Sequence, residues 1–487
     1  MKIISRFLRE QKRYSKNELA SIFELDEPGI EGFIRTLKAY NILKAVKNNV
    51  EQRDMTDIID EDIQVADESA DNEQYLYVFV YVGVITIGRR ILKIYPKYLL
   101  TAEQPLDEMK IVLKVLEKYS SSEEQIVNLY NGDGDNRSFN LLAVILFLLN
   151  DYYEYGIYNN TEDIVEINGE GEILWGKTID ENFALISDNR PYYMEMYTRR
   201  SVDDENNYFK RLHEIILTEC SKQLEDSQLT DLFEMESLSF TEDKLDDLGE
   251  RDYILDRIMG ELSVQFNTRK QILLKTIYTY ISQDRKMLEE NQGISMYGTT
   301  AFNLIWEKIC GEVFSNKLQA QLGSLQLPVP LAAGFNPKDK LIDIIEKPEW
   351  IGNGYSKTAK DTMIPDLITM KLSGEEAWFI ILDAKYYNIQ MDVDKSLRGQ
   401  PGIESITKQY LYQLAYKDFI EKHGFTAVKN CFLLPTDKDD FIVKGYVKMD
   451  ILHQLGLENI AVRLLPAKKM LISYITNKRI SVDALQL

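Results

Sequence analysis

Two aspartates and a lysine stand at the ends of two apolar runs in the last third of this 487-residue chain. Asp366 opens the run 364–370, Asp383 ends the run 377–384, and Lys385 follows two residues later. If the runs are strands that pair across the short turn between them, both carboxylates lie at the same end of the hairpin. Because side chains alternate along a strand, Asp383 and Lys385 then share one face of it.

Paired carboxylates beside an ammonium group favour hydrolysis of a phosphodiester bond. Two carboxylates in a partly buried site repel each other, and an oxygen-binding cation such as Mg²⁺ allows both to stay ionised. A bound Mg²⁺ lowers the pKa of a water and polarises the phosphate, while the lysine stabilises the negative charge that develops. Such residues also occur together by chance in an acidic chain. The apolar run that leads into Asp383 favours the catalytic interpretation.

The surrounding pattern predicts a compact α/β unit over residues 296–487. An amphipathic helix is predicted at 300–318, before the two strands, and a second helix at 406–424, after them. A further strand is predicted at 428–435. The unbroken apolar run at 377–384 is typical of a strand that is covered on both faces.

The preceding residues predict two further parts, so we expect a multidomain α+β protein. Residues 1–99 begin with short helices, among them an amphipathic segment at 5–11 and a capping box at Ser15 and Glu18. Strand-like runs follow at 75–100, and the order is typical of a winged-helix-like module that binds either DNA or protein.

Residues 100–295 predict a mixed helical and β region. Two apolar helices are expected at 109–119 and 140–156, a glycine-punctuated β stretch at 162–182, and charged helices beyond residue 203. A strongly acidic run at 51–74 is expected to be a solvated loop.

The composition excludes several classes of protein. A net charge of −21 disfavours coating of nucleic acid by the whole surface, although a local basic groove remains compatible with it. The three cysteines and three histidines are isolated, which disfavours a zinc site and a disulfide framework. No apolar run is long enough to span a membrane and no signal-peptide pattern is present, so we expect a cytoplasmic protein. We expect another chain to supply any nucleotide hydrolysis that the system requires.

The residues from Pro365 to Lys385 resemble the PD-(D/E)XK nuclease motif. This resemblance implies a C-terminal α/β nuclease core in which Asp366 and Asp383 bind the metal and Lys385 serves the attacking water. It also implies a further acidic metal ligand on the preceding helix, where Glu307 matches.

A Gln/Tyr motif on the helix after the strands belongs to the same resemblance. It implies a catalytic role for Gln413, with Gln409 and Tyr416 as the neighbouring candidates. The spacing departs slightly from the usual Q-x-x-x-Y, so the choice between the two glutamines stays open.

The order of the parts extends the resemblance beyond the nuclease motif. Residues 81–98 and 173–180, followed by the nuclease motif, resemble McrC-like subunits, and the chain is similar to the LlaJI-type restriction endonuclease family. This implies a phage-defence endonuclease that cleaves double-stranded DNA with Mg²⁺, or alternatively Mn²⁺, together with an McrB-like AAA+ GTPase that alone binds GTP. We expect that partner to dock on residues 100–290, and two copies of the chain to pair transiently on DNA.

Two other functions stay open at this point. One is a standalone defence or repair nuclease that selects DNA through its N-terminal module. The other is a non-catalytic winged-helix adaptor with a degenerate nuclease fold, which the presence of Asp366, Asp383, Lys385 and Glu307 disfavours.

Overall fold

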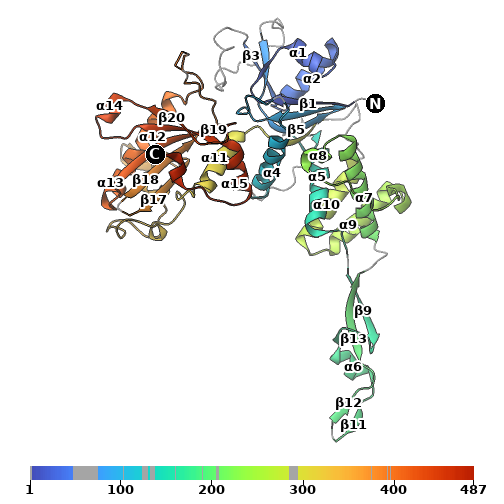
Figure 1. Cartoon of the computed structure of the whole chain (residues 1–487). Helices are drawn as coiled ribbons and strands as arrows, with labels where there is room; N and C mark the ends of the chain where they lie inside the picture. The colour runs from blue at the N-terminus through green and yellow to red at the C-terminus, as the bar shows by residue number, and fades with distance from the viewer. Residues whose placement is uncertain are drawn as a thin grey trace. The chain divides into compact units, whose positions relative to one another are not determined.

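The computed structural model groups the chain into two compact units (Figure 1). Unit 1 comprises Met1–Ile126, Gly132–Arg137 and Met296–Leu487, and unit 2 comprises Val127–Asn131 and Ser138–Ser295. The structure describes residues 3–47, 75–102, 104–122, 130–131, 138–159, 161–188, 190–203, 208–283, 294–374, 376–391, 393–394 and 396–487.

Unit 1 therefore unites the two ends of the sequence. The predicted boundary before residue 296 coincides with the end of unit 2. The predicted separation of residues 1–99 from residues 296–487 stays a prediction, and the acidic run at 51–74 lies outside the described residues.

The N-terminal strand β1 (Ile4–Arg9) pairs in parallel with β6 (Arg90–Tyr95). The helix predicted at 5–11 is therefore wrong. Ile4 and Leu8 are both buried, and a spacing of four residues puts two side chains on one face in a helix and in a strand alike. Pairing with β6 decides the conformation. The sheet has the order β1-β6-β5-β14, with β5 at Val82–Ile87 and β14 at Ile294–Thr299.

A smaller sheet and two helices follow β1. The capping box is confirmed: Glu18 N donates to Ser15 Oγ at 3.1 Å, and Ser15 N donates to Glu18 Oε2 at 2.7 Å. The winged-helix identity of this part stays a prediction. The sheet has the order β2-β4-β3, and its elements are β2 (Arg13–Tyr14), α1 (Lys16–Ile22), α2 (Glu27–Ala39), β3 (Leu43–Lys47) and β4 (Tyr75–Phe79).

The C-terminal part of unit 1 contains a five-stranded sheet of order β17-β18-β19-β21-β20 (Figure 1). The three central strands are parallel, and each edge strand is antiparallel to its neighbour. The predicted order of helix, strand, turn, strand, helix and strand is confirmed. The strands are β17 (Leu367–Ser373), β18 (Glu376–Ala384), β19 (Ala427–Thr436), β20 (Ile442–Val447) and β21 (Ile460–Pro466).

The central strand β18 is buried along most of its length, as the apolar run predicts. Helices α11 (Phe302–Val313) and α12 (Ile403–Ala415) both contact it. The helix predicted at 406–424 is interrupted at Tyr416, and α13 (Lys417–Lys422) continues from there. One core cluster joins β17, β18, α12 and α13 through Ile368, Phe379, Ile381, Tyr412, Tyr416 and Phe419. The remaining elements of this part are β15 (Glu349–Gly352), β16 (Tyr355–Thr358), α14 (Asp450–His453) and α15 (Ala467–Ile475).

Helix α4 (Leu106–Ser122), predicted in the middle region, belongs to unit 1 and packs against α15. Its Lys118 ammonium donates to the main-chain carbonyl of Tyr474 and, at 2.6 Å, to Asn477 Oδ1. The predicted middle region therefore contributes an element to the C-terminal part.

Unit 2 combines a helical part with a strand-rich segment at 161–203. The helices are α5 (Leu141–Tyr155), α7 (Tyr208–Asp226), α8 (Thr230–Phe233), α9 (Arg251–Val264) and α10 (Thr268–Gln283). The segment contains β9 (Thr161–Ile167), β10 (Glu172–Ile173), α6 (Trp175–Glu181), β11 (Leu185–Ser187), β12 (Arg190–Tyr192) and β13 (Tyr197–Asp203). The β prediction for 162–182 is thus correct for its first half and wrong at α6. Among the described residues, no helix is long and apolar enough to cross a bilayer.

Candidate active site

The hairpin of β17 and β18 brings the two aspartates together. Leu367 pairs with Leu382, so Asp366, one residue before β17, stands opposite Asp383. Asp366 Oδ2 also accepts a hydrogen bond from the Ala384 main-chain nitrogen at 2.9 Å. The hairpin expected from the sequence is therefore present, with its first strand starting after Asp366.

Lys385 completes this group. Its main-chain nitrogen donates to Leu433 O on β19 at 3.0 Å, which extends the sheet pairing beyond β18. Its ammonium lies 2.6 Å from Asp383 Oδ1 and 4.0 Å from Asp366 Oδ2. The side chain of Asp383 is 5% exposed, whereas those of Asp366 and Lys385 are 19% and 20% exposed. Asp383 thus forms the buried end of the site, and the other two side chains face its opening.

The electrostatics of the aspartate pair favour a bound proton when no cation is present. Burial raises the pKa of Asp383, and the charge of Asp366 raises it further, which outweighs the opposing effect of Lys385. Burial lowers the pKa of Lys385, but the charges of Asp383 and Asp366 outweigh burial and raise it above its usual value. The ammonium therefore stays charged beside a carboxyl that resists ionisation.

Glu307 lies on α11 and shares a pocket with Asp366. Burial, and then the charge of Asp366, raise the pKa of Glu307 to about 7, against the opposing effect of Lys385. The helix is held by Trp306, whose Nε1 donates to Leu433 O at 3.2 Å. Since the same carbonyl accepts the Lys385 main-chain nitrogen, Leu433 fixes the helix of Glu307 and the end of β18 together.

The two candidate glutamines and Tyr416 make different contacts. The Gln413 side-chain oxygen accepts from Asn430 Nδ2 at 2.9 Å and from the Glu458 main-chain nitrogen at 3.1 Å. These contacts are with residues other than the carboxylates, so the catalytic role of Gln413 stays a prediction. Gln409 Nε2 donates to Ile381 O on β18 at 3.2 Å, and its Oε1 is buried without a donor among the described residues. Tyr416, the other candidate, donates to Leu341 O at 3.1 Å.

Two further residues contact the main chain near Asp366, and the sequence pattern did not predict either of them. Tyr412 donates to Ile364 O at 2.8 Å, and burial together with the charges of Asp383 and Asp366 raises its pKa. Its position three residues after Gln409 on the same helix was the available signal. Asn316 donates to Asp366 O at 3.1 Å and so positions its main chain, but an isolated asparagine gives no pattern in the sequence.

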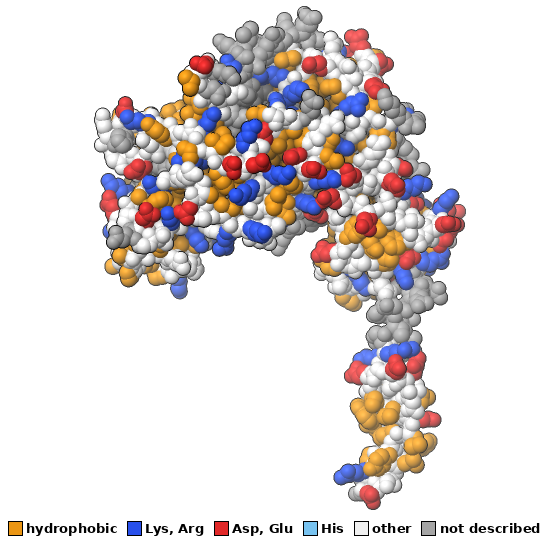
Figure 2. All heavy atoms as spheres, in the orientation of Figure 1, with side chains coloured by type: hydrophobic (Ala, Val, Ile, Leu, Met, Phe, Trp, Pro, Cys, Tyr) orange, Lys and Arg blue, Asp and Glu red, His pale blue; other side chains and the backbone are white. Residues whose placement is uncertain are grey.

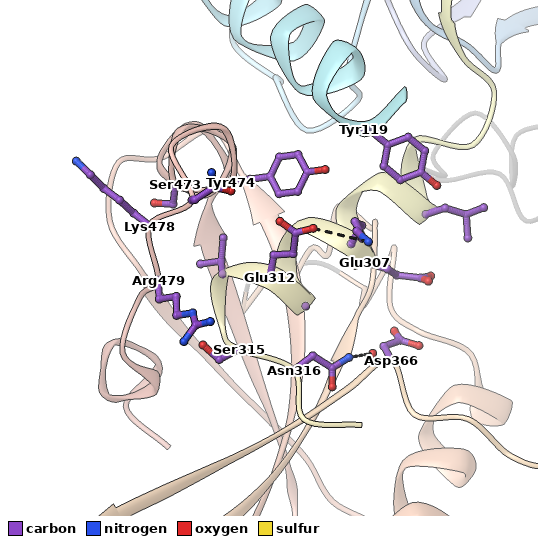
Figure 3. A pocket seen from close by; sticks show the side chains of 15 residues that line it. Tyr119, Glu307, Glu312, Ser315, Asn316, Asp366, Ser473, Tyr474, Lys478 and Arg479 are labelled. Atoms are coloured by element: carbon purple, nitrogen blue, oxygen red, sulfur yellow. Dashed lines mark hydrogen bonds and ion pairs between the residues drawn. The ribbon is translucent and has the colours of Figure 1, made fainter. Parts of the chain in front are cut away.

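Asp366 and Glu307 line a pocket of about 660 Å³. Figure 3 shows these two acidic residues on one side of the pocket and Arg479 and Lys478 on the other. Lys308 also lines it and forms an ion pair with Glu312 at 3.7 Å. The acidic residues thus face a basic wall across open space.

A divalent cation at this site requires several oxygen ligands close together. Among the described residues, no group of three or more His, Cys, Asp or Glu side chains stands in metal-binding geometry. Asp383 Oδ1 is buried, and the Lys385 ammonium lies 2.6 Å from it as an ion pair. Carboxylate oxygens are the donors that Mg²⁺ prefers, and metal binding releases protons from such ligands. The carboxylates of Asp366, Asp383 and Glu307 are therefore of the chemical type that a hard divalent cation prefers, and their binding of one stays a prediction.

Comparisons with known proteins give the family. The profile of the LlaJI restriction endonuclease matches residues 81–468. The chain is 31% identical over 424 residues to the Type II restriction enzyme BsuMI component YdjA of Bacillus subtilis (strain 168), over 84% of this chain and 83% of that protein. The chain belongs to the LlaJI restriction endonuclease family.

Two solved structures from Thermococcus gammatolerans are also similar to the chain. One is a half-complex of McrB AAA+ hexamers with bound McrC, at 12% identity and a TM-score of 0.36, over 97% of this chain and 99% of that chain. The other is the McrBC complex, at 11% identity and a TM-score of 0.24, over 62% of this chain and 85% of that chain.

Proposed function

We propose that this chain is the Mg²⁺-dependent DNA-cleaving subunit of a restriction system. The observation that carries the proposal is the convergence of Asp366, Asp383 and Lys385 at one end of the β17–β18 hairpin. Membership of a restriction endonuclease family supports a DNA substrate for these residues.

Each residue has a distinct role in the proposed PD-(D/E)XK-type site. Asp366 and Asp383 hold the cation, and Glu307, which lines the same pocket as Asp366, is the third acidic ligand. When bound, Mg²⁺ supplies a water of lowered pKa and polarises the scissile phosphate. Lys385 orients that water and stabilises the negative charge on the phosphate, because its ammonium stays charged at the opening of the site.

The basic wall of the pocket suits the DNA backbone. Arg479 and Lys478 line the pocket on the side away from Asp366 and Glu307, so they can bind phosphates next to the one that is cleaved. This local basic surface reconciles DNA binding with the net charge of −21. Both residues act by positioning the substrate in this proposal.

We also propose that a partner subunit completes the system. The Bacillus subtilis relative is named as a component of a restriction enzyme. Residues 171–178 of this chain match the Walker-type pattern, but Gly176 and Lys177 lie inside α6 and not in a loop before a helix, and Thr178 is buried. The strand-rich segment 161–203 exposes a set of apolar side chains, along which Figure 2 shows hydrophobic side chains gathered. The set comprises Ile167, Trp175, Ile179, Phe183, Leu185, Ile186 and Met194. Such a surface suits docking on an McrB-like AAA+ GTPase, which would bind the GTP.

The test is plasmid cleavage by the purified full-length chain with Mg²⁺, with and without GTP and the protein encoded beside it. We expect cleavage only with both additions. We expect Lys385→Ala to abolish cleavage and still bind the partner. Robust cleavage by the chain alone would support a standalone nuclease instead, and unchanged cleavage by Lys385→Ala would show that the proposed site is wrong.

Cleavage of both DNA strands requires two such sites. We therefore propose that two copies pair transiently on double-stranded DNA. Mass photometry with and without a DNA duplex tests this: a purely monomeric bound species during double-strand cleavage would contradict it.

A further inference from the structure

The residue after Lys385 is held by the opposite end of the chain. The Tyr386 hydroxyl donates to Glu10 Oε2 at 2.6 Å, across 376 residues of sequence. The Lys97 main-chain nitrogen donates to the same carboxylate oxygen at 3.1 Å. Glu10 follows β1 and Lys97 follows β6, so the N-terminal sheet contacts the chain directly beyond β18.

Aromatic contacts fix the ring of Tyr386 as well. It packs at 5.3 Å from the ring of Phe302, the first residue of α11, which also carries Glu307. Tyr98 packs edge-on against it at 6.2 Å, and the Lys97 ammonium lies 4.8 Å from its centroid. A second tie follows two residues later, where Asn388 Nδ2 donates to Lys97 O at 3.0 Å. The end of β18 and the start of α11 therefore meet the N-terminal part at one side chain.

The hydrogen bond between Glu10 and Tyr386 is not needed to fill space in the core. Glu10 is only 7% exposed, and a buried carboxylate is costly unless donors satisfy it. Burial, and then the charge of Glu10, raise the pKa of Tyr386, so its hydroxyl remains a donor. A phenylalanine at position 386 would fill the same space but would leave Glu10 without this donor. The hydrogen bond between Tyr386 and Glu10 therefore fixes the orientation of the Tyr386 side chain, which an apolar contact alone does not do.

We propose that Glu10 and Tyr386 are positioning residues that orient the Lys385 side chain in the nuclease site. The Leu433 carbonyl fixes the Lys385 main chain on the sheet side, and Tyr386 fixes the next residue. Because adjacent side chains in extended chain point to opposite faces, anchoring Tyr386 sets the direction of Lys385. The N-terminal part then contributes to catalysis by orienting Lys385, in addition to any binding role of its own. This inference rests on the proposed role of Lys385.

The experiment compares Tyr386→Phe with Tyr95→Phe in the full-length chain, assayed with the neighbouring gene product and GTP. Tyr95 is the matched control, because its buried ring also loses one hydroxyl, which donates to Ala102 O at 2.9 Å. We expect Tyr386→Phe to slow single-turnover cleavage by roughly tenfold to a hundredfold, the scale of a misplaced catalytic group, with unchanged DNA affinity. The control should cleave at the wild-type rate.

Two further measurements separate positioning from general stability. Adding Glu10→Gln to Tyr386→Phe should slow cleavage no further, because Glu10 acts on Lys385 through the hydrogen bond that Tyr386→Phe already removes. Hydrogen exchange in residues 383–388 should be faster in Tyr386→Phe than in Tyr95→Phe, and this readout does not depend on activity. Independent, multiplying effects of the two substitutions, or unchanged exchange, would overturn the inference. Wild-type cleavage by Tyr386→Phe with an inactive Lys385→Ala would overturn it too, and would leave the proposed function intact. An active Lys385→Ala would reject the proposed function itself.

Discussion

Replacing Glu307 with glutamine should make the stability of the metal-free protein less dependent on pH. Burial and the charge of Asp366 raise the pKa of Glu307 from 4.5 to about 7. The folded chain therefore binds this proton more tightly than the unfolded chain. The resulting stabilisation is fully present below pH 4.5 and is lost as the pH rises through 7. Glutamine carries no titratable group, so the variant lacks this dependence.

The shift sets the size of the effect. One pKa unit corresponds to about 1.4 kcal/mol, so the shift from 4.5 to about 7 corresponds to at most about 3.5 kcal/mol in the free energy of unfolding, and solvent screening of the half-buried carboxylate reduces this. Between pH 6 and pH 8, a single group with a pKa of about 7 loses about 1.4 kcal/mol of this. Relative to wild type, Glu307→Gln should therefore gain about 1.4 kcal/mol between these two pH values.

Urea unfolding in EDTA, followed by tryptophan fluorescence, measures this difference. Trp306 is fully buried beside Glu307 and reports on this part of the fold. The matched control is Glu312→Gln on the same helix, where the carboxylate is 41% exposed and paired with Lys308. The control should keep the wild-type pH slope. Equal stability differences at pH 6 and pH 8 for Glu307→Gln would refute the burial of Glu307 against Asp366.

Three further predictions concern the substrate, the cation and the partner. Arg479→Ala should weaken DNA binding and reduce the slope of log affinity against log salt by about 1, measured by fluorescence anisotropy; an unchanged slope would remove Arg479 from the DNA surface. Mg²⁺ affinity, measured by calorimetry, should rise between pH 6 and pH 8, because Glu307 and Asp383 must release protons to bind it; a flat profile would count against these ligands. Phe183→Asp should abolish binding of the GTPase partner in a pull-down and leave DNA binding intact, since its side chain is 99% exposed in unit 2; normal partner binding would place the docking surface elsewhere.

The sequence was most informative where the geometry is local. Asp366, Asp383 and Lys385 lie within 20 residues, and a hairpin with alternating side chains has one way of bringing them together. The capping box at Ser15 and Glu18 is local in the same sense, and it is confirmed. The strand prediction failed at α6 because Gly171 before the helix and Gly176 inside it resemble the turns between strands.

Long-range contacts could not be predicted in this way. Glu10 and Tyr386 meet only because β1 pairs with β6, and the spacing of Ile4 and Leu8 fits a helix equally well. The orientation of Gln413 depends on Asn430, which lies on a strand that a single sequence does not place beside it. The pKa of Glu307 could not be predicted either. It is raised by burial, and the periodicity of a helix alone does not show how deeply a side chain is buried.

The central claim is that Asp366 and Asp383 hold a divalent cation beside Lys385. Calorimetric titration of the purified chain with Mn²⁺ at pH 8, in wild type, Asp383→Asn and Glu312→Gln, tests it most directly. We expect a site that is present in wild type and Glu312→Gln and absent in Asp383→Asn. Equal Mn²⁺ binding by all three proteins would contradict the account.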